Sequence, residues 1–291
     1  MTLPTSDTVV TYPAGDTAAE ARVLHVESAE VDGGLRLAVL LDRTPCHPVD
    51  AAWPDQGADR ATLDAGDLAL PVLDCVVGAT DGSTLFLGAD IPVRKGTEGW
   101  AFVVVHLVDP DAGLTEGDTV TVEVDAAYRR ALSAGHSACH LASLALDAAL
   151  AGAWSKETAP DALGFPGFDA AAIDTSTIIE NGSRDVYRVG KSMRKRGFDP
   201  AALDDPAALA SAVDATLASW IASGGAIRIE RDGELLTDRR YWVADLPGGE
   251  ARIACGGTHV ASLADLGTVT VSLETQPLDG ATALTMLTAA C

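Results

Sequence analysis

Short runs in which apolar residues alternate with polar ones, or cluster, recur through the first 125 residues and predict β-strands. Residues 21–28 and 35–41 are two such runs, and the Asp32-Gly33-Gly34 triplet between them is typical of a hairpin turn. Further strand-like runs lie at 67–77, 84–86, 100–108 and 119–124. Repeated short strands with turn residues between them predict a β-barrel domain at 1–125.

Helical spacing of apolar residues replaces this pattern after residue 126. One helix is expected from Tyr128 to about Gly152, and a second from Pro206, behind an acidic cap, to Gly224. Strand-like runs lie at 173–179, 226–230, 241–244 and 268–273. The predicted fold class is α+β: the N-terminal β-barrel domain is followed at 126–291 by an α/β two-layer domain with helices packed on an antiparallel sheet.

Two short motifs in the second part carry ligands for a metal ion. His136 and His140 are four residues apart in the predicted helix, so their side chains project from one face. Segment 255–259, Cys-Gly-Gly-Thr-His, has glycines that let a tight turn aim its cysteine and histidine at one point. Alone, the first motif arises by chance in many helices, and the second is more often a buried inert thiol beside a hydrogen-bonded loop histidine. Together they predict one zinc ion, Zn2+, bound by His136, His140, Cys255 and His259.

No other combination of the histidines and cysteines has comparable spacing, so we expect one zinc ion per chain. The five cysteines lack a disulfide-like spacing, and the N-terminus has neither a basic stretch nor an apolar core of signal-peptide length. These features predict a cytoplasmic protein. A membrane helix needs roughly eighteen apolar residues in a row, and such a run is absent, so no membrane partner is expected.

The formal net charge of −22 argues against nonspecific binding to nucleic acid and against DNA as a partner. Segment 184–196 departs from this balance, because it carries six cationic side chains and one acidic one. Such a run is either a solvated helix end or an anion-binding patch beside the zinc. The candidate anion contacts are Arg188, Lys191 and Arg194.

The two ligand motifs, in this order, resemble those of the alanyl-tRNA editing family. This family comprises the editing domain of alanyl-tRNA synthetase and the free-standing AlaX proteins, and the editing domain of threonyl-tRNA synthetase is a more distant likeness. Segments 41–45, 71–74 and 117–130 are similar to the lead-in of the longer AlaX proteins. The resemblance therefore covers nearly the whole chain, and it makes 126–291 the editing (deacylase) domain.

The resemblance implies a trans-acting aminoacyl-tRNA deacylase that hydrolyses the ester of a mischarged small amino acid, serine or glycine on alanine tRNA. Its partner would be the 3′ end and acceptor stem of the aminoacyl-tRNA. Residues 180–183 stand where the family has glutamine, any residue, glycine and serine, which makes Asn181, Gly182 and Ser183 candidate substrate contacts. The candidates for backbone contacts to the ester or its oxyanion are Gly256, Gly257 and Thr258.

Two departures from the family keep other functions open. Residues 51–56 replace a Gly-Gly-Gln motif, and Glu180 replaces the glutamine. One alternative is a zinc hydrolase of a non-standard aminoacyl-tRNA or of a small-molecule ester or thioester. Another is a non-catalytic tRNA-binding module with a structural zinc ion. The sequence leaves open the amino acid, the tRNA, the catalytic or structural role of zinc, and the oligomeric state.

Overall fold

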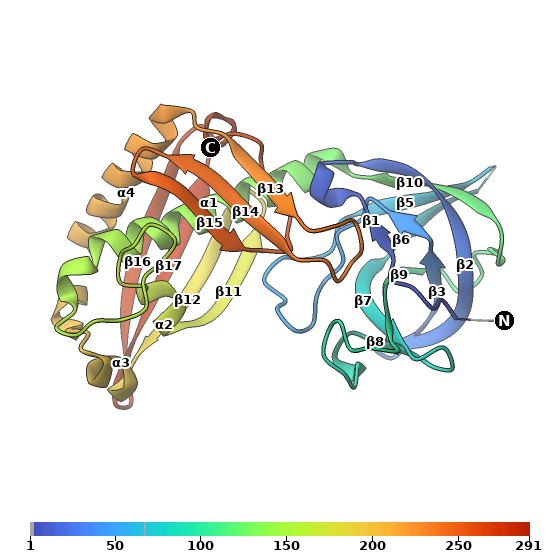
Figure 1. Ribbon diagram of the computed structural model, residues 1–291, viewed down its shortest axis with the longest axis horizontal. Coiled ribbons are helices and arrows are strands. Elements are labelled where there is room, and N and C mark those ends of the chain that lie inside the picture. The colour runs from blue at the N-terminus through green and yellow to red at the C-terminus, as the bar shows by residue number, and fades with distance from the viewer. Residues whose placement is uncertain (1–2, 67) are drawn as a thin grey trace. The chain divides into compact units, whose positions relative to one another are not determined.

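The computed structural model describes residues 3–66 and 68–291, and these fall into two compact units (Figure 1). The first unit comprises Met1–Arg129, Arg231–Arg240 and Gly256–Thr258. The second unit comprises Arg130–Glu230, Tyr241–Cys255 and His259–Cys291. Two short segments from late in the sequence therefore belong to the first unit.

An antiparallel sheet forms the first unit, with the strand order β6-β5-β10-β2-β3-β9-β7-β8 among the described residues. Its strands are β2 (Ala18–Val31), β3 (Gly34–Leu41), β5 (Ala61–Ala65), β6 (Leu68–Val72), β7 (Asp74–Thr80), β8 (Leu85–Leu87), β9 (Ala101–Val108) and β10 (Thr119–Val124). A small parallel pair joins β1 (Val9–Val10) to β4 (Arg43–Thr44), and the short 3-10 helices are η1 (Tyr12–Ala14) and η2 (Gly88–Asp90).

The predicted closed barrel is wrong, because within residues 3–66 and 68–291 the sheet stays open at β6 and β8. Both edge strands are poor partners for a further strand. β8 has only three residues, and β6 contains Pro71, which has no N–H to donate. The run expected at 67–77 is two strands, β6 and β7, and its first residue, Asp67, lies outside the described residues.

The loop between β4 and β5 is fixed by a buried ion pair. The Arg129 guanidinium donates to both carboxylate oxygens of Asp59. It also donates to the carbonyl oxygen of Pro45 at 2.7 Å. Asp59 also accepts the backbone N–H of His47 at 2.6 Å. The ring of His47 is buried 5.1 Å from that of Tyr12, and burial lowers the pKa of His47 to about 4.

Two sheets and two long helices share one hydrophobic core in the second unit. The four-stranded sheet has the order β11-β12-β17-β16, and the three-stranded sheet has the order β13-β14-β15. The strands are β11 (Ile173–Ile179), β12 (Gly182–Val189), β13 (Ile227–Arg231), β14 (Arg240–Leu246), β15 (Gly249–Ala254), β16 (Val269–Leu278) and β17 (Ala281–Ala290). The helices are α1 (Ala126–Ala149), α2 (Phe168–Ala172), α3 (Lys191–Arg196), α4 (Pro206–Ser223), η3 (Ala151–Ala153), η4 (Pro200–Leu203) and η5 (Leu263–Leu266).

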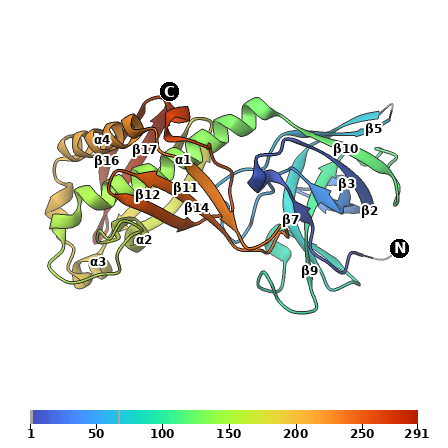
Figure 2. The same ribbon diagram turned by 45° about the horizontal axis from the view of Figure 1, so that its top comes forward.

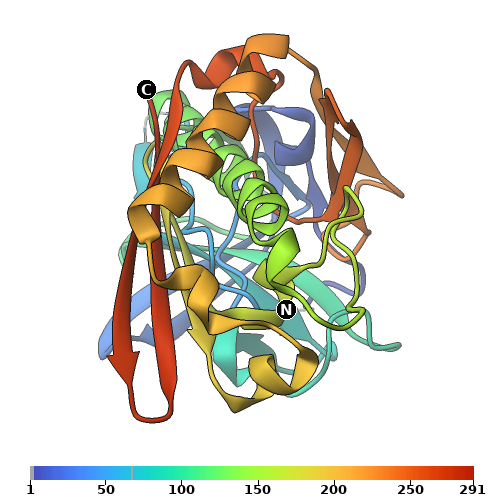
Figure 3. The same cartoon turned by 90° about the vertical axis from the view of Figure 1, so that its left-hand side faces the viewer.

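Helix α1 is buried on nearly all sides from Leu132 to Asp147. Figure 3 shows α1 between the four-stranded and the three-stranded sheet, so it packs on two sides. Its many Ala, Ser and Gly residues allow this close approach. The Asp125 carboxylate caps the helix by accepting two backbone N–H groups at 3.0 Å.

Helix α4 begins and ends where its sequence signals predicted. Asp205 accepts the backbone N–H of Ala208 at 2.9 Å, and Gly224 ends the helix with a φ of 62°. Figure 2 shows α4 lying along β16, against which it buries Val213 and Leu217. The second unit is therefore α+β with helices on an antiparallel sheet. No helix in the described part of the chain is long and apolar enough to cross a membrane.

Two carboxyl groups of the second unit are withdrawn from solvent, that of Asp147 near the end of α1 and that of Asp169 on α2. The backbone N–H of Asp169 donates to Asp147 at 2.7 Å, and the Tyr187 hydroxyl donates to Asp169 at 3.0 Å. Burial raises the pKa of Asp147 to about 8 and that of Asp169 to about 6. Because the unfolded chain has an ordinary carboxyl pKa, folding makes Asp147 bind a proton.

We predict that the contribution of Asp147 to the stability of the protein falls as the pH rises from about 4 to about 8. The protonated Asp147 contributes fully below its unfolded pKa, and the contribution is lost as the pH rises through the folded value. One such group changes the free energy of unfolding by about 1.4 kcal/mol per pH unit inside the window. Urea unfolding at several pH values should show a shallower slope for Asp147→Asn, while Asp204→Asn, at an exposed carboxyl, should keep the original slope.

Candidate metal centre

Four nitrogen and sulfur donors converge in the second unit. α1 supplies His136 and His140, and the chain after β15 supplies Cys255 and His259. The Cys255 Sγ lies 3.4 Å from Nε2 of His136 and 3.3 Å from Nε2 of His259. All four donor atoms lie within 4.8 Å of one another, so the structure brings together the four residues that the two motifs predicted.

The state of His140 fits a metal ligand. Its Nε2 is buried, and no residue in 3–66 or 68–291 forms a hydrogen bond with it. Burial lowers the pKa of His140 to about 4, so the imidazole is neutral at physiological pH and keeps a lone pair. A buried polar atom without a partner destabilises the fold by about 1–3 kcal/mol. Coordination to zinc by three imidazoles and one thiolate would satisfy it.

Ser137, inside the His-x-x-x-His motif, orients one of these imidazoles. Its Oγ accepts the backbone N–H of Val260 at 3.2 Å and lies 3.2 Å from Nδ1 of His259. If Nδ1 carries the proton and donates to Ser137, Nε2 is left with the lone pair that faces Cys255. The spacing of the metal ligands did not reveal this role, although Ser137 follows the first ligand directly in the sequence.

We predict that Ser137→Ala weakens zinc binding about 10–100-fold, the usual effect of losing a partner that orients a ligand. All four ligands remain, so competition with a chromogenic chelator would measure the change directly. Ser143→Ala is the matched control, because Ser143 is also buried on α1 but donates only to the carbonyl of His140 at 3.0 Å. Equal zinc affinity of the two variants would remove Ser137 from the centre.

Trp242 on β14 forms an aromatic wall beside the imidazoles. Its ring centroid lies 5.0 Å from that of His140 and 6.2 Å from that of His259, and the side chain is fully buried. Cys255 and His259 are only half-buried, so the centre is not fully closed to solvent on their side. We predicted the strand around Trp242 from its pattern, but nothing in the sequence indicated this contact.

The turn at Glu180-Asn181, between β11 and β12, packs against α1 next to the first ligand. The backbone N–H of Asn181 donates to the carbonyl of Ala131 at 2.8 Å, and Asn181 has a φ of 57°. Gly135 faces this turn, and a Cβ there would overlap backbone atoms of Ile179 and Gly182. The predicted substrate motif thus lies beside His136, and Gly135 permits the approach.

Ser183, one of the predicted substrate contacts, has a hydrogen-bond partner within the protein that the family motif did not predict. Its buried hydroxyl donates to Asp185 at 2.7 Å, and Ser176 donates to the same carboxylate at 2.6 Å. Burial raises the pKa of Asp185 above its ordinary range. The Sγ of Cys139 on α1 lies 3.5 Å from the Asp185 carboxylate, so this thiol faces the sheet.

Thr258, between the ligands of the second motif, belongs to the first unit and is held there by Gln56. The backbone N–H of Thr258 donates to Oε1 of Gln56 at 3.0 Å, and Nε2 of Gln56 donates to the Thr258 hydroxyl at 2.9 Å. The N–H of Thr258 is therefore engaged, and Gly256 and Gly257 remain as candidate oxyanion donors. Gln56 was not predicted, because 202 residues separate it from Thr258.

The basic segment lies on β12 and α3, and its two arginines on the strand point away from α1. Asp185 contacts Cys139 of α1, so Arg184 and Arg188, on the alternate positions, lie on the exposed face of the sheet. These two side chains therefore lie on the face of the sheet opposite to α1, which carries two of the candidate zinc ligands. Arg188 and Lys191 line a polar hollow of about 370 Å³.

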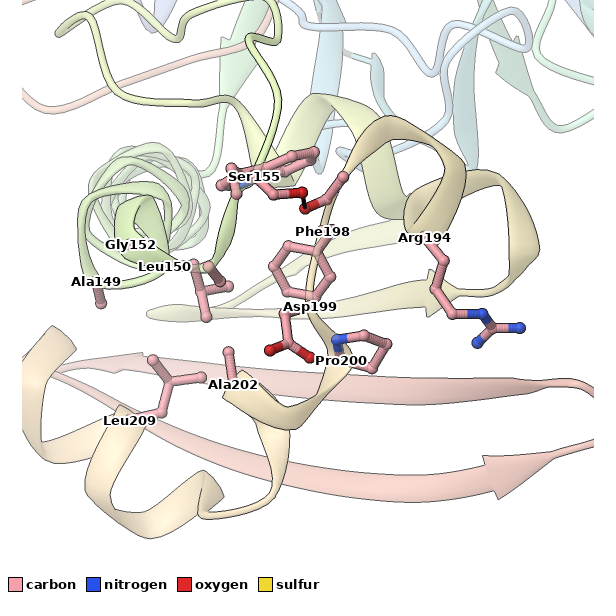
Figure 4. Close-up of a pocket in the computed structure, with 13 residues that line it drawn as sticks. Ala149, Leu150, Gly152, Ser155, Arg194, Phe198, Asp199, Pro200, Ala202 and Leu209 are labelled. Carbon is pink, nitrogen blue, oxygen red and sulfur yellow. Dashed lines mark hydrogen bonds between the residues drawn. The ribbon is translucent and has the colours of Figure 1, made fainter.

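A second hollow, of about 790 Å³, lies past the end of α1 (Figure 4). Phe198 and Leu150 line its centre and Arg194 its edge. The nine residue steps from His140 to Ala149 correspond to about 13.5 Å along a helix axis, so this hollow is separate from the metal centre. Arg194 also donates to the carbonyl of Gly280 at 3.2 Å.

Comparison with known proteins shows a likeness to alanine–tRNA ligases, although no family model matches the chain. The chain is 26% identical over 251 residues to the ligase of Kocuria rhizophila, covering 83% of this chain and 23% of the ligase. It is 31% identical over 184 residues to that of Ruegeria pomeroyi, covering 60% and 19%. It is 23% identical over 280 residues to that of Trichormus variabilis, covering 90% and 26%. The chain thus spans about a quarter or less of the length of these relatives.

Proposed function

We propose that this protein hydrolyses the ester bond between a mischarged small amino acid and the 3′ end of tRNA, using a zinc ion held by the metal centre. The convergence of His136, His140, Cys255 and His259 carries the proposal. The likeness to alanine–tRNA ligases supports it, since it covers most of this chain but only a limited part of each ligase. Such a segment would carry one activity of the ligase, and hydrolytic editing is a reaction that a zinc ion can support.

The residues around the centre have separate tasks in this proposal. Zinc bound there would supply a Lewis acid for the ester carbonyl. Ser137 holds the His259 ring in the tautomer that presents Nε2, and Trp242 keeps water from the buried side of the imidazoles. Gly256 and Gly257 offer backbone N–H groups to the negative charge that develops on the carbonyl oxygen. The half-buried side at Cys255 and His259 admits the aminoacyl end.

Serine or glycine on alanine tRNA is the proposed substrate, because the similar proteins are alanine–tRNA ligases. A panel of tRNAs charged with serine, glycine, alanine or threonine tests this, with release of each amino acid as the readout. Faster release of serine or glycine than of alanine would support the proposal. Equal, uncatalysed release of all four would contradict it.

A second candidate is a zinc hydrolase that acts on another ester or thioester. Two observations favour it: Glu180 stands where the family resemblance gives a glutamine, and the net charge of −22 opposes a polyanionic substrate. A carboxylate accepts hydrogen bonds but donates none, so Glu180 would select a different group on the substrate. Hydrolysis of short aminoacyl esters or thioesters without release from tRNA would identify this candidate.

We predict that replacing Arg188, Lys191 and Arg194 together with alanine raises the KM for aminoacyl-tRNA and weakens the salt dependence of the rate. The exposed side chains of Arg188 and Lys191 can bind phosphate groups away from the ester, and each phosphate contact adds to the salt dependence. The variant should bind zinc normally and hydrolyse a short aminoacyl ester at the original rate. An unaltered salt dependence on tRNA would mean that these cations are only a solvated surface run.

A further inference from the structure

A second group of metal-binding side chains lies in the core of the first unit, far apart in sequence. Cys46, Cys75 and His106 are fully buried, and their donor atoms lie within 4.8 Å of one another. Each comes from a different segment: the chain after β4, strand β7 and strand β9. We expected no second site because these residues have no motif spacing.

The backbone register of the sheet sets this geometry. β7 and β9 are antiparallel, and Cys75 is directly opposite His106. Side chains of directly opposite residues lie on the same face of a sheet with their Cβ atoms about 4.5–5.5 Å apart. The segment after β4 lies beside β7, because the backbone N–H of Val49 donates to the carbonyl of Cys75 at 2.8 Å. This contact brings Cys46 to the pair.

The hydrogen bonds of His106 leave a lone pair on Nε2, and this nitrogen can bind a metal ion. Nδ1 lies 3.3 Å from the carbonyl oxygen of Val39, which can only accept, so Nδ1 carries the proton. Nε2 lies 2.9 Å from the hydroxyl of Thr44, whose oxygen already accepts the backbone N–H of Cys46 at 3.1 Å. A backbone carbonyl on the far nitrogen is the usual arrangement behind a metal-bound imidazole. The Thr44 hydroxyl can rotate and release Nε2 to a cation.

The two thiols are placed to share one proton. A hydrogen bond from Cys75, and to a lesser degree the neighbouring His106, lowers the pKa of Cys46 to about 5, whereas burial raises the pKa of Cys75 well above its ordinary value. The hydrogen bond between the two thiols favours loss of the first proton from Cys46. A metal ion competes with protons for such ligands and would displace them.

We propose that Cys46, Cys75 and His106 form a second metal site, which takes a thiophilic d10 cation, either Cu+ or Zn2+. Two sulfur donors and one imidazole select these soft or borderline ions over Mg2+ or Ca2+. All three ligands are fully buried, as in closed sites that stabilise a fold. A cation there would tie the start of the loop between β4 and β5 to the central strands of the sheet.

Metal stoichiometry of the full chain tests the proposal without reference to activity. The reduced protein is loaded anaerobically with Zn2+ or with Cu+, freed of weakly bound metal and measured by mass spectrometry of the metals. We expect two equivalents in the wild type, one in Cys75→Ala and one in Cys255→Ala, whereas Cys291→Ala, at an exposed thiol, keeps two. The cation that fills the second equivalent identifies the ion.

Cys75→Ala would also lose metal if the variant failed to fold, so a second measurement keeps Cys75 in place. X-ray absorption at the metal edge of the loaded Cys255→Ala protein, in which the new site is intact, should show two sulfur neighbours and one nitrogen. One equivalent in the wild type, or a loaded Cys255→Ala protein whose metal has no sulfur neighbour, would overturn the proposal. So would a Cys46–Cys75 disulfide that persists in the reduced, metal-loaded protein.

Discussion

Cys255→Ala is expected to lower bound zinc and ester hydrolysis together while the second unit stays folded. The Cys255 Sγ lies between the Nε2 atoms of His136 and His259, and it is the anionic donor of the four. Its loss removes a ligand outright, so zinc affinity should fall at least as much as the roughly 10–100-fold typical of losing a ligand's outer partner. The side chain is half-buried, so its truncation removes little packing.

Zinc content by mass spectrometry and hydrolysis of a mischarged tRNA should be measured on the same preparation of the variant. Cys291→Ala is the control, because this thiol is exposed and lies outside both metal groups. Loss of zinc with an unchanged thermal unfolding midpoint would support a catalytic role. Loss of zinc accompanied by unfolding would assign the ion a structural role. Full zinc occupancy in the variant would remove Cys255 from the centre.

Gly135→Ala is expected to destabilise the second unit and weaken the metal centre. The new Cβ would overlap the backbone oxygens of Ile179 and Gly182, which cannot move aside as a flexible side chain can. Overpacking of this kind destabilises by about 1–3 kcal/mol. The better helix propensity of alanine offsets up to about 1 kcal/mol of that. Because Gly135 precedes His136, a shift of α1 or of the turn also displaces the first ligand.

Chemical unfolding and zinc affinity should therefore both change in Gly135→Ala. Gly152→Ala is the matched control, since no described atom lies within 4 Å of the position that its Cβ would take. If Gly135→Ala has the stability and the zinc affinity of the wild type, the turn at Asn181 does not depend on this close approach.

The convergence of the four candidate metal ligands was predictable because each half of the centre lies within five residues of sequence. Helical periodicity placed His136 and His140 on one face, and two glycines allowed the turn before His259. Partners contributed by distant segments were not predictable in this way. Gln56 binds Thr258 across 202 residues, and only the pairing of β7 with β9 places Cys75 opposite His106.

The fold shows the same division between local and distant information. The capping residues of α4 are adjacent to it in the sequence, so they predicted both of its ends. Strand β12 was missed because polar residues lie on both of its faces, with Asp185 buried and Arg184 exposed, so its apolar alternation is broken. The open sheet of the first unit was read as a barrel because strand runs do not show which edges pair.

The central claim is that the centre of His136, His140, Cys255 and His259 hydrolyses aminoacyl-tRNA with zinc. The most direct measurement follows release of serine from serine-charged alanine tRNA by the wild-type protein, first as purified, then after chelation, and again after zinc is restored. The account predicts that chelation abolishes release and that one equivalent of zinc at the centre restores it. Undiminished release from protein shown to be free of zinc would contradict the account.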